Sequence, residues 1–172
     1  ISEGTTIGID LGIKHFAILS DGTKIDNNRF LQQSLKKLRV AQRSFARKKK
    51  GSNRRLMQKK VVAKIYDKVT NQRKDFLHKL STQIVNEYDS IAIENLNIAG
   101  MIKNRKLARH IADVSWGTFE TFLKYKADWY GKNILQIGMF EPSSKMCSCG
   151  KVNNELNLSR RTWTCNSCNT TT

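Results

Sequence analysis

The hydrophobic pattern changes period along this chain, and that change limits the possible folds more than any other feature. Residues 5–10 alternate apolar and polar side chains, as a half-buried strand does. Residues 15–19 are apolar enough for a second strand, and the Asp21-Gly22 turn would return the chain as a third strand over residues 24–30. The sequence therefore predicts an antiparallel opening of three strands.

Helical spacing replaces the alternation after residue 30. A basic loop at residues 48–53 separates two stretches with an apolar stripe, residues 31–45 and residues 54–87. The stripes consist of Leu31, Leu35, Leu38 and Phe45, and then of Ile65, Val69, Phe76, Leu80 and Ile84. We expect a basic helical hairpin over residues 31–87 that is apolar inside and cationic outside.

The second half of the chain returns to shorter elements. Residues 90–94 predict a fourth strand, residues 96–109 a basic loop or short helix, and residues 133–139 a fifth strand that ends before Pro142. Ser115 is the predicted N-cap of a helix with an inward face formed by Phe119, Leu123, Ala127 and Tyr130. The order β-β-β-α-α-β-α-β suits an RNase H-like α/β layer fold with one mixed sheet.

Charge points to a polyanionic partner. The chain has 31 Lys and Arg against 14 Asp and Glu, a formal net charge of +17, and 17 of the basic residues lie between Lys36 and Lys79. Phosphate contact explains this segment better than a solvated helix face, because a merely soluble helix would mix both signs. Nucleic acid is the expected partner, and an anionic membrane is the less favoured one. The predicted nucleic-acid-binding residues are Arg43, Arg47, Lys48, Lys49, Lys50, Arg54, Arg55, Lys59, Lys60, Arg73, Lys103, Arg105, Arg160 and Arg161.

Membrane and secretion signals are not expected in this chain. No stretch approaches the ~20 apolar residues that a membrane helix needs. The start at Ile1 lacks the basic and apolar regions of a secretory signal. Hydrophobic residues make up 39% of the chain, which is enough for a core. We therefore expect a cytoplasmic chain without a membrane partner.

Two of the predicted apolar strands end in an acidic residue. Asp10 ends the first strand and Glu94 ends the fourth. A carboxylate in that position is unfavourable unless it is paired, and two on adjacent strands can converge on a hard cation such as Mg2+ or Mn2+. Two such ions about 4 Å apart can activate a water and stabilise the leaving oxygen in phosphodiester hydrolysis. In the structural alternative, Asp10 caps a turn and Glu94 pairs with a Lys or Arg.

The first of these carboxylates permits a second interpretation. Actin-like ATPases, including sugar kinases and Hsp70-type proteins, open with an Asp-x-Gly phosphate turn that is similar to Gly8-Ile9-Asp10-Leu11-Gly12. Those proteins need a duplicated domain, and the chain has no second Gly-x-Asp-x-Gly. The ATPase is therefore the less favoured hypothesis.

All four cysteines lie close together in two pairs, Cys147-Ser148-Cys149 and Cys165-Asn166-Ser167-Cys168. Without a secretion signal, such clustering favours metal over disulfides. Four thiolates would form a closed, structural Zn2+ site that gives a small region its fold. The first pair is one residue short of the usual knuckle, whose turn supplies backbone N–H groups, so four reduced thiols and weak zinc occupancy are the alternatives. We expect a zinc ribbon at residues 143–172 beside an α/β unit at residues 1–142.

The tryptophans and histidines carry weaker signals. Trp116, Trp129 and Trp163 are predicted to be core residues. A nucleic-acid contact is considered for Trp163 alone, because Arg160 and Arg161 precede it. The three histidines, His15, His78 and His110, show no partner pattern and are predicted to be ordinary surface or core residues.

Several segments, in order along nearly the whole chain, resemble the TnpB/OrfB family of insertion-sequence proteins, which is related to type V CRISPR effector nucleases. The matching segments are residues 7–12 with the Asp21-Gly22 hairpin, 48–52, 71–79, 91–97, 124–131, 142–145 and 158–165. The resemblance implies a RuvC-type nuclease domain that is guided by a transposon-derived RNA and cuts a DNA target. It also implies a prokaryotic, nucleoid-associated protein that is often named a transposase.

The family pattern assigns roles to the singled-out residues. Asp10 and Glu94 would be the first and second catalytic carboxylates, and the four cysteines would form a ribbon inserted before the third. In the family a third Asp follows the last cysteine, and an N-terminal domain grips the guide RNA; residues 1–172 contain neither. The ribbon unit is therefore expected to be C-terminally truncated. The alternative to the nuclease is a catalytically inactive repressor, RNA-guided or simply DNA-binding, on the same fold. The oligomeric state is not predicted.

Overall fold

The computed structural model describes residues 4–105, 107–138, 146–153 and 163–171. The chain divides into two compact units, Ile1–Ile137 and Gly138–Thr172. The first unit holds all the named helices and strands, and the second holds the four cysteines. Each unit is described separately below.

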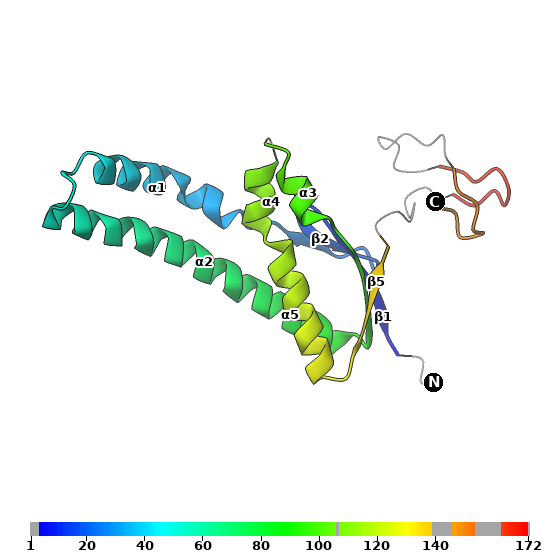
Figure 1. Cartoon of the computed structure of the whole chain (residues 1–172). Helices are drawn as coiled ribbons and strands as arrows, with labels where there is room; N and C mark the ends of the chain where they lie inside the picture. Colours follow the sequence, from blue (N-terminus) through cyan, green and yellow to red (C-terminus); the bar gives the residue numbers. More distant parts are fainter. Residues whose placement is uncertain (1–3, 106, 139–145, 154–162, 172) are drawn as a thin grey trace. The chain divides into compact units, whose positions relative to one another are not determined.

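The first unit contains a five-stranded mixed sheet with the strand order β3-β2-β1-β4-β5. Figure 1 labels β1, β2 and β5 of this sheet. β1 pairs with β2 and β2 with β3 in antiparallel fashion, whereas β1 with β4 and β4 with β5 are parallel. The predicted antiparallel opening and the mixed sheet are therefore confirmed. The strands are β1 (Thr6–Leu11), β2 (His15–Leu19), β3 (Lys24–Asp26), β4 (Ser90–Glu94) and β5 (Asn133–Ile137).

The turn between β2 and β3 follows the sequence signal. Gly22 has a φ of +88°, which favours glycine, and the Thr23 N–H donates to Asp21 Oδ1 at 2.8 Å. The prediction that the third strand runs to residue 30 is wrong, because β3 ends at Asp26. The Asn27 side chain accepts a hydrogen bond from the Arg29 N–H, which turns the chain into the following helix.

The predicted basic hairpin consists of α1 (Phe30–Ala46) and α2 (Asn53–Glu87), which pack side by side and extend beyond the sheet (Figure 1). Ser52 caps α2, since its Oγ accepts from the Arg55 N–H at 3.2 Å. The stretch predicted as a loop or short helix contains α3 (Ile98–Ile102) and α4 (Ala108–Val114). None of the described helices is both long and apolar enough to cross a membrane.

The fifth helix, α5 (Trp116–Trp129), begins directly after Ser115, the predicted N-cap position, but without the expected side-chain cap. Ser115 lies between α4 and α5 in the left-handed region, with φ 60°, and makes no side-chain cap. Its Oγ instead donates to the Ala112 carbonyl at 3.1 Å. The inward face of α5 contains Phe119, Leu123 and Ala127 as predicted, but Tyr130 lies past the helix end and is exposed.

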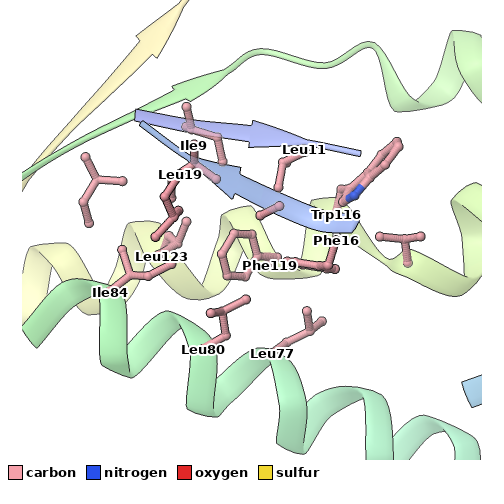
Figure 2. Packing of buried hydrophobic residues seen from close by; sticks show 14 of the residues in the cluster. Ile9, Leu11, Phe16, Leu19, Leu77, Leu80, Ile84, Trp116, Phe119 and Leu123 are labelled. Carbon is pink, nitrogen blue, oxygen red and sulfur yellow. The ribbon is translucent and has the colours of Figure 1, made fainter. Parts of the chain in front are cut away.

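One face of the sheet packs against α2 and α5 and forms the hydrophobic core (Figure 2). Phe16 from β2 contacts Phe119 and Phe76 edge to face, each at a ring-centroid distance of 5.1 Å. Leu80 and Ile84 of the predicted α2 stripe are buried in the same cluster. Alternating strand residues such as Ile9 supply the sheet side of this core, so their neighbours face the opposite side.

The tryptophan predictions are only partly correct. Trp116 is buried in the core, as predicted. Trp129 is 75% exposed, so its assignment to the core is wrong; it is the last residue of α5 and contacts Tyr125 with a ring-centroid distance of 4.7 Å. Trp163 is buried beside Cys147 and Cys165 in the second unit, which leaves little ring surface for stacking on a base. Arg160 and Arg161 lie outside the described residues.

Candidate metal and nucleic-acid sites

Asp10 and Glu94 lie on neighbouring parallel strands at the same level. The register pairs Ile9 of β1 with Ile93 of β4, and Asp10 and Glu94 are the next residues of these two strands. Ile9 and Ile93 are buried in the core, so the two carboxylates point to the opposite face of the sheet. They also lie at the carboxyl ends of their strands, where open α/β sheets bind ligands. The fold thus pairs the two strands that carry the acidic residues singled out from the sequence.

The two carboxylates have no protein cation as a partner among the described residues. The ion pairs of the described chain involve neither Asp10 nor Glu94. The structural alternative, a Lys or Arg paired with Glu94, therefore has no counterpart there. Asp10 is exposed and Glu94 is half-buried. Two neighbouring carboxylates repel one another, and a divalent cation that both could ligate would remove that repulsion.

Two residues after Asp10, at Gly12, the chain passes very close to the backbone of His15. A Cβ added at Gly12 would lie 3.0 Å from the His15 carbonyl oxygen, tighter than side chains usually tolerate. The Gly12 N–H donates to the Phe16 carbonyl at 3.1 Å and closes this turn. Glycine at this position therefore lets the chain leave β1 next to Asp10 without a steric clash.

The four cysteine sulfurs of the second unit converge on one point. Cys147 Sγ and Cys168 Sγ lie 3.4 Å apart, Cys149 Sγ and Cys165 Sγ lie 3.7 Å apart, and all four lie within 4.8 Å of one another. Four thiolates about 2.3 Å from a tetrahedral Zn2+ would be separated by about 3.8 Å. The donor set and its spacing therefore fit zinc.

The shorter first pair keeps the backbone donors that a knuckle needs. Each sulfur receives the N–H of the residue two positions later: Cys149 to Cys147, Lys151 to Cys149, Ser167 to Cys165 and Thr170 to Cys168. A left-handed residue follows each pair, Gly150 with φ 84° and Asn169 with φ 54°. The two knuckles thus have the same local design, although one has a residue fewer.

The four thiols also affect one another's ionisation. The backbone N–H of Cys149 lowers the pKa of the Cys147 thiol to about 6, although burial opposes it. The Lys151 N–H lowers the pKa of Cys149, but the neighbouring thiols outweigh it and raise that pKa to about 11. Crowded sulfurs thus resist simultaneous ionisation, which a bound cation would permit.

Most of the predicted nucleic-acid-binding residues lie on accessible positions. On the hairpin Lys48 is half-buried, while Arg43, Arg47, Lys49, Lys50, Arg54, Lys59 and Lys60 are exposed. Lys103 and Arg105 are exposed after α3. A cavity of about 520 Å³ beside the hairpin loop is lined in part by Lys48, Arg54, Lys60 and Lys64. Lys64 was not singled out from the sequence, although it follows Lys60 by one helical turn.

Two of these arginines, Arg55 and Arg73, make hydrogen bonds or ion pairs within the first unit. The Arg55 guanidinium donates to the carbonyls of Phe45 and Lys48, at 3.1 and 2.9 Å, and lies over the Phe45 ring. It therefore closes the hairpin loop. Arg73 Nη2 lies 2.7 Å from Asp113 Oδ1 and joins α2 to α4. These bonds leave Arg55 and Arg73 fewer donors for a phosphate than their exposed neighbours have.

Comparison with known families matches both parts of the chain. Residues 2–105 match the family OrfB_IS605, described as "Probable transposase". Residues 116–172 match the "Cas12f1-like, TNB domain" family, which includes all four cysteines.

Curated relatives match along nearly the whole chain. A Streptomyces pristinaespiralis protein named "Putative RNA-guided DNA endonuclease" is 42% identical over 160 residues, which is 92% of this chain and 40% of the relative. The Escherichia coli K12 protein "Putative RNA-guided DNA endonuclease InsQ" is 31% identical over 95% of this chain and 44% of its own length. The chain thus spans less than half the length of these relatives.

Solved structures share the fold. The Cas12f1 protein in a complex with sgRNA and target DNA aligns with a TM-score of 0.58 and 19% identity, over 99% of this chain and 47% of that one. A Cas12f ternary complex aligns with a TM-score of 0.60 and 20% identity, over 98% and 36%. Together, the sheet topology, the cysteine cluster and the sequence matches show that this chain belongs to the TnpB/OrfB family of insertion-sequence proteins.

Proposed function

We propose that residues 1–142 form a RuvC-type, RNase H-like nuclease unit of a transposon-associated, RNA-guided DNA endonuclease, and that residues 143–172 form its zinc ribbon. The observation that carries the proposal is the parallel pairing of β1 with β4 up to Ile9 and Ile93, the core-facing residues that come directly before Asp10 and Glu94. The names of the curated relatives and the shared fold with nucleic-acid complexes of Cas12f support it.

In this proposal Asp10 and Glu94 act as oxygen ligands. Mg2+ or Mn2+, when bound, supplies Lewis-acid activation of a water and of the scissile phosphate. The carboxylates suit these ions because hard cations prefer oxygen donors. The parallel pairing of β1 with β4 fixes the spacing of the two carboxylates, and the buried Ile9 and Ile93 hold the strand ends in place.

The basic hairpin formed by α1 and α2 would follow the phosphate backbone of the target or of the guide–target duplex. Its exposed Lys and Arg side chains read charge and shape rather than bases. Arg55 keeps the hairpin loop closed, which presents Lys49 and Lys50 outward. The zinc ribbon plays a structural part, since a closed site of four thiolates leaves no position for a reacting water.

A nucleic-acid-binding protein without nuclease activity is the second candidate. The exposed basic hairpin favours it, because phosphate contacts there do not depend on Asp10 or Glu94. The two candidates share every binding residue, so cleavage alone separates them.

DNA cleavage by the natural reading frame that contains this chain, loaded with its transposon-end RNA in Mg2+, tests the proposal. Asp10→Asn and Glu94→Gln should each lower the cleavage rate by about 100-fold or more, as expected for loss of a group that stabilises transition-state charge. Asp128→Asn, which changes an exposed carboxylate on α5, is the matched control and should cleave normally. Unchanged cleavage in either site variant would refute the assignment. Guide-dependent binding without cleavage by the wild type would favour the inactive repressor, and ATP turnover without DNA would favour the ATPase.

A further inference from the structure

A pocket of about 240 Å³ lies between α1 and α4, and the proposed function gives α4 no role. Its walls include Leu31, Leu35 and Arg39 from α1 and Arg109, His110 and Asp113 from α4. On α1 the three residues are spaced four apart, so they share one face of the helix. Two leucines thus provide apolar walls, and three basic side chains reach the pocket from two helices.

The one acidic group in these walls is already neutralised. Asp113 Oδ1 accepts a hydrogen bond from the Leu31 N–H at 3.1 Å and lies 2.7 Å from Arg73 Nη2. Its side chain is only 9% exposed. α1 has no acidic residue in its first turn, so Asp113 also provides the negative charge that favours a helix N-terminus. The Asp113 charge is therefore balanced by Arg73 and by α1.

The basic residues of the pocket have no such partner. Arg39, Arg109 and His110 are exposed and take part in no ion pair within the described parts of the chain. A guanidinium presents several N–H donors in a planar fork that matches the oxygens of a phosphate. Two such forks and an imidazole around one small pocket form an anion site with an excess of positive charge.

The chemistry of the surroundings indicates which anion fits. Arg39 belongs to the run of basic residues on α1 that includes Lys36, Lys37 and Arg43. The pocket therefore continues the cationic surface that the proposed function assigns to nucleic acid. The run from Arg39 to the loop at Lys48 covers about 14 Å at 1.5 Å per helical residue, so one strand backbone could contact both places.

We propose that this pocket binds one phosphodiester group of a nucleic-acid strand, held by Arg39 from α1 and Arg109 from α4, with His110 as a further donor. The proposal rests on the proposed function in one respect, namely that the chain binds nucleic acid. It adds α4 to the binding surface, whereas the predicted residues of the first unit lie on α1, α2, their loop and the segment after α3. DNA and RNA offer the same phosphodiester chemistry, so the test uses each separately.

The test measures the affinity of the natural reading frame for its transposon-end RNA and for target DNA over a series of KCl concentrations. Arg39→Gln and Arg109→Gln should each weaken binding by about tenfold, as loss of a charge-assisted hydrogen bond does. The slope of log K against log salt should become shallower by about 0.7–0.9 for one lost phosphate contact. Because both arginines hold the same group, the double variant should lose less than the product of the two single losses.

Two further variants make the outcome specific. Lys124→Gln removes one positive charge from α5, where Lys124 pairs with Glu120 at 2.7 Å, and should leave both affinities nearly unchanged. Arg39→Lys keeps the charge and loses the planar fork, so it should weaken binding in part. Unchanged thermal unfolding of each variant would show that the fold is intact.

Each outcome decides the proposal. An effect confined to RNA assigns the pocket to the guide, and an effect confined to DNA assigns it to the target; both support a phosphodiester site. Unchanged affinities and slopes in both arms would overturn it, as would an equal effect of Lys124→Gln. A wild type that binds neither nucleic acid would overturn this proposal and the proposed function together, whereas binding without cleavage would overturn the nuclease alone.

Discussion

Each of the two units of this chain is stabilised by a different kind of interaction. In the first unit, apolar side chains from β1, β2, β4, α2, α4 and α5 form one buried cluster. In the second unit, Cys147, Trp163 and Cys165 are the buried residues of the described part. Burial of apolar area stabilises a fold roughly in proportion to that area, so this effect stabilises the first unit far more than the described part of the second. We therefore expect the second unit to depend on a metal bound by its four cysteines.

Zinc removal should give the largest effect and should affect one unit alone. Cys165→Ser, or a chelator, is expected to unfold the described parts of the second unit, because structural zinc contributes about 10–16 kcal/mol in small domains. The amide NMR chemical shifts of residues 146–153 and 163–171 should move to random-coil values, while those of the sheet should stay unchanged. Persistent native shifts in the metal-free second unit would show that apolar packing suffices there.

A core truncation should have the reverse effect. Leu123 is fully buried on α5, so Leu123→Ala should lower the free energy of unfolding of the first unit by about 2–5 kcal/mol. Leu135 on β5 is 56% exposed, so Leu135→Ala should cost less than about 0.5 kcal/mol. Urea unfolding followed by tryptophan fluorescence, together with zinc content by mass spectrometry, checks both. Loss of zinc from the Leu123 variant would contradict the independence of the two units.

Polar contacts in the first unit should contribute more to its stability when they are more deeply buried. Arg73→Met leaves the nearly buried Asp113 carboxylate without its ion pair and should destabilise the unit by about 1–3 kcal/mol. Lys79→Met removes an exposed pair with Asp75 and should change stability by less than about 1 kcal/mol. Thermal unfolding compares the two variants. Equal effects would mean that the Arg73–Asp113 contact contributes no more than a surface pair.

The smallest expected effect concerns acid stability. A hydrogen bond from Lys132 lowers the pKa of Asp89 below its usual 3.8, and the Thr5 N–H lowers it further. Since the folded-state pKa is depressed, the contribution of Asp89 to stability is present above about pH 3.8 and is lost as pH falls through the folded-state pKa. Lys132→Met should move the Asp89 pKa back toward 3.8 in an NMR titration. An unchanged pKa would mean that Thr5 alone sets it.

Hydrophobic periodicity predicted the elements that bury one face. It located β1, α1, α2 and the inward face of α5, because each of them repeats apolar residues at its own period, whereas β2 was predicted from its apolar content. It failed where local contacts outweigh periodicity. The third strand ends early because Asn27 turns the chain, and Ser115 occupies the predicted N-cap position of α5 in a left-handed conformation that makes no side-chain cap.

The sequence also could not predict the parts of the candidate sites that depend on tertiary contacts. The sequence identified Asp10 and Glu94 as strand-ending carboxylates, but their adjacency depends on the pairing of β1 with β4, which are far apart in the chain. The bonds of Arg73 to Asp113 and of Arg55 to the hairpin-loop carbonyls also depend on tertiary structure. A count of basic residues cannot separate these two arginines from those that stay accessible. The shortened cysteine pair is a similar case, since its backbone donors became visible only in three dimensions.

Selective metal binding at Asp10 and Glu94 tests the central claim most directly. Substoichiometric Mn2+, added to the zinc-loaded chain, should broaden the amide NMR signals of Leu11, Gly12 and Asn95 first, because a paramagnetic ion relaxes the nuclei nearest to it. The account predicts that Asp10→Asn or Glu94→Gln abolishes this selectivity, while Asp128→Asn preserves it. Broadening that starts elsewhere, or that is the same in the two site variants, would contradict a metal site between these carboxylates.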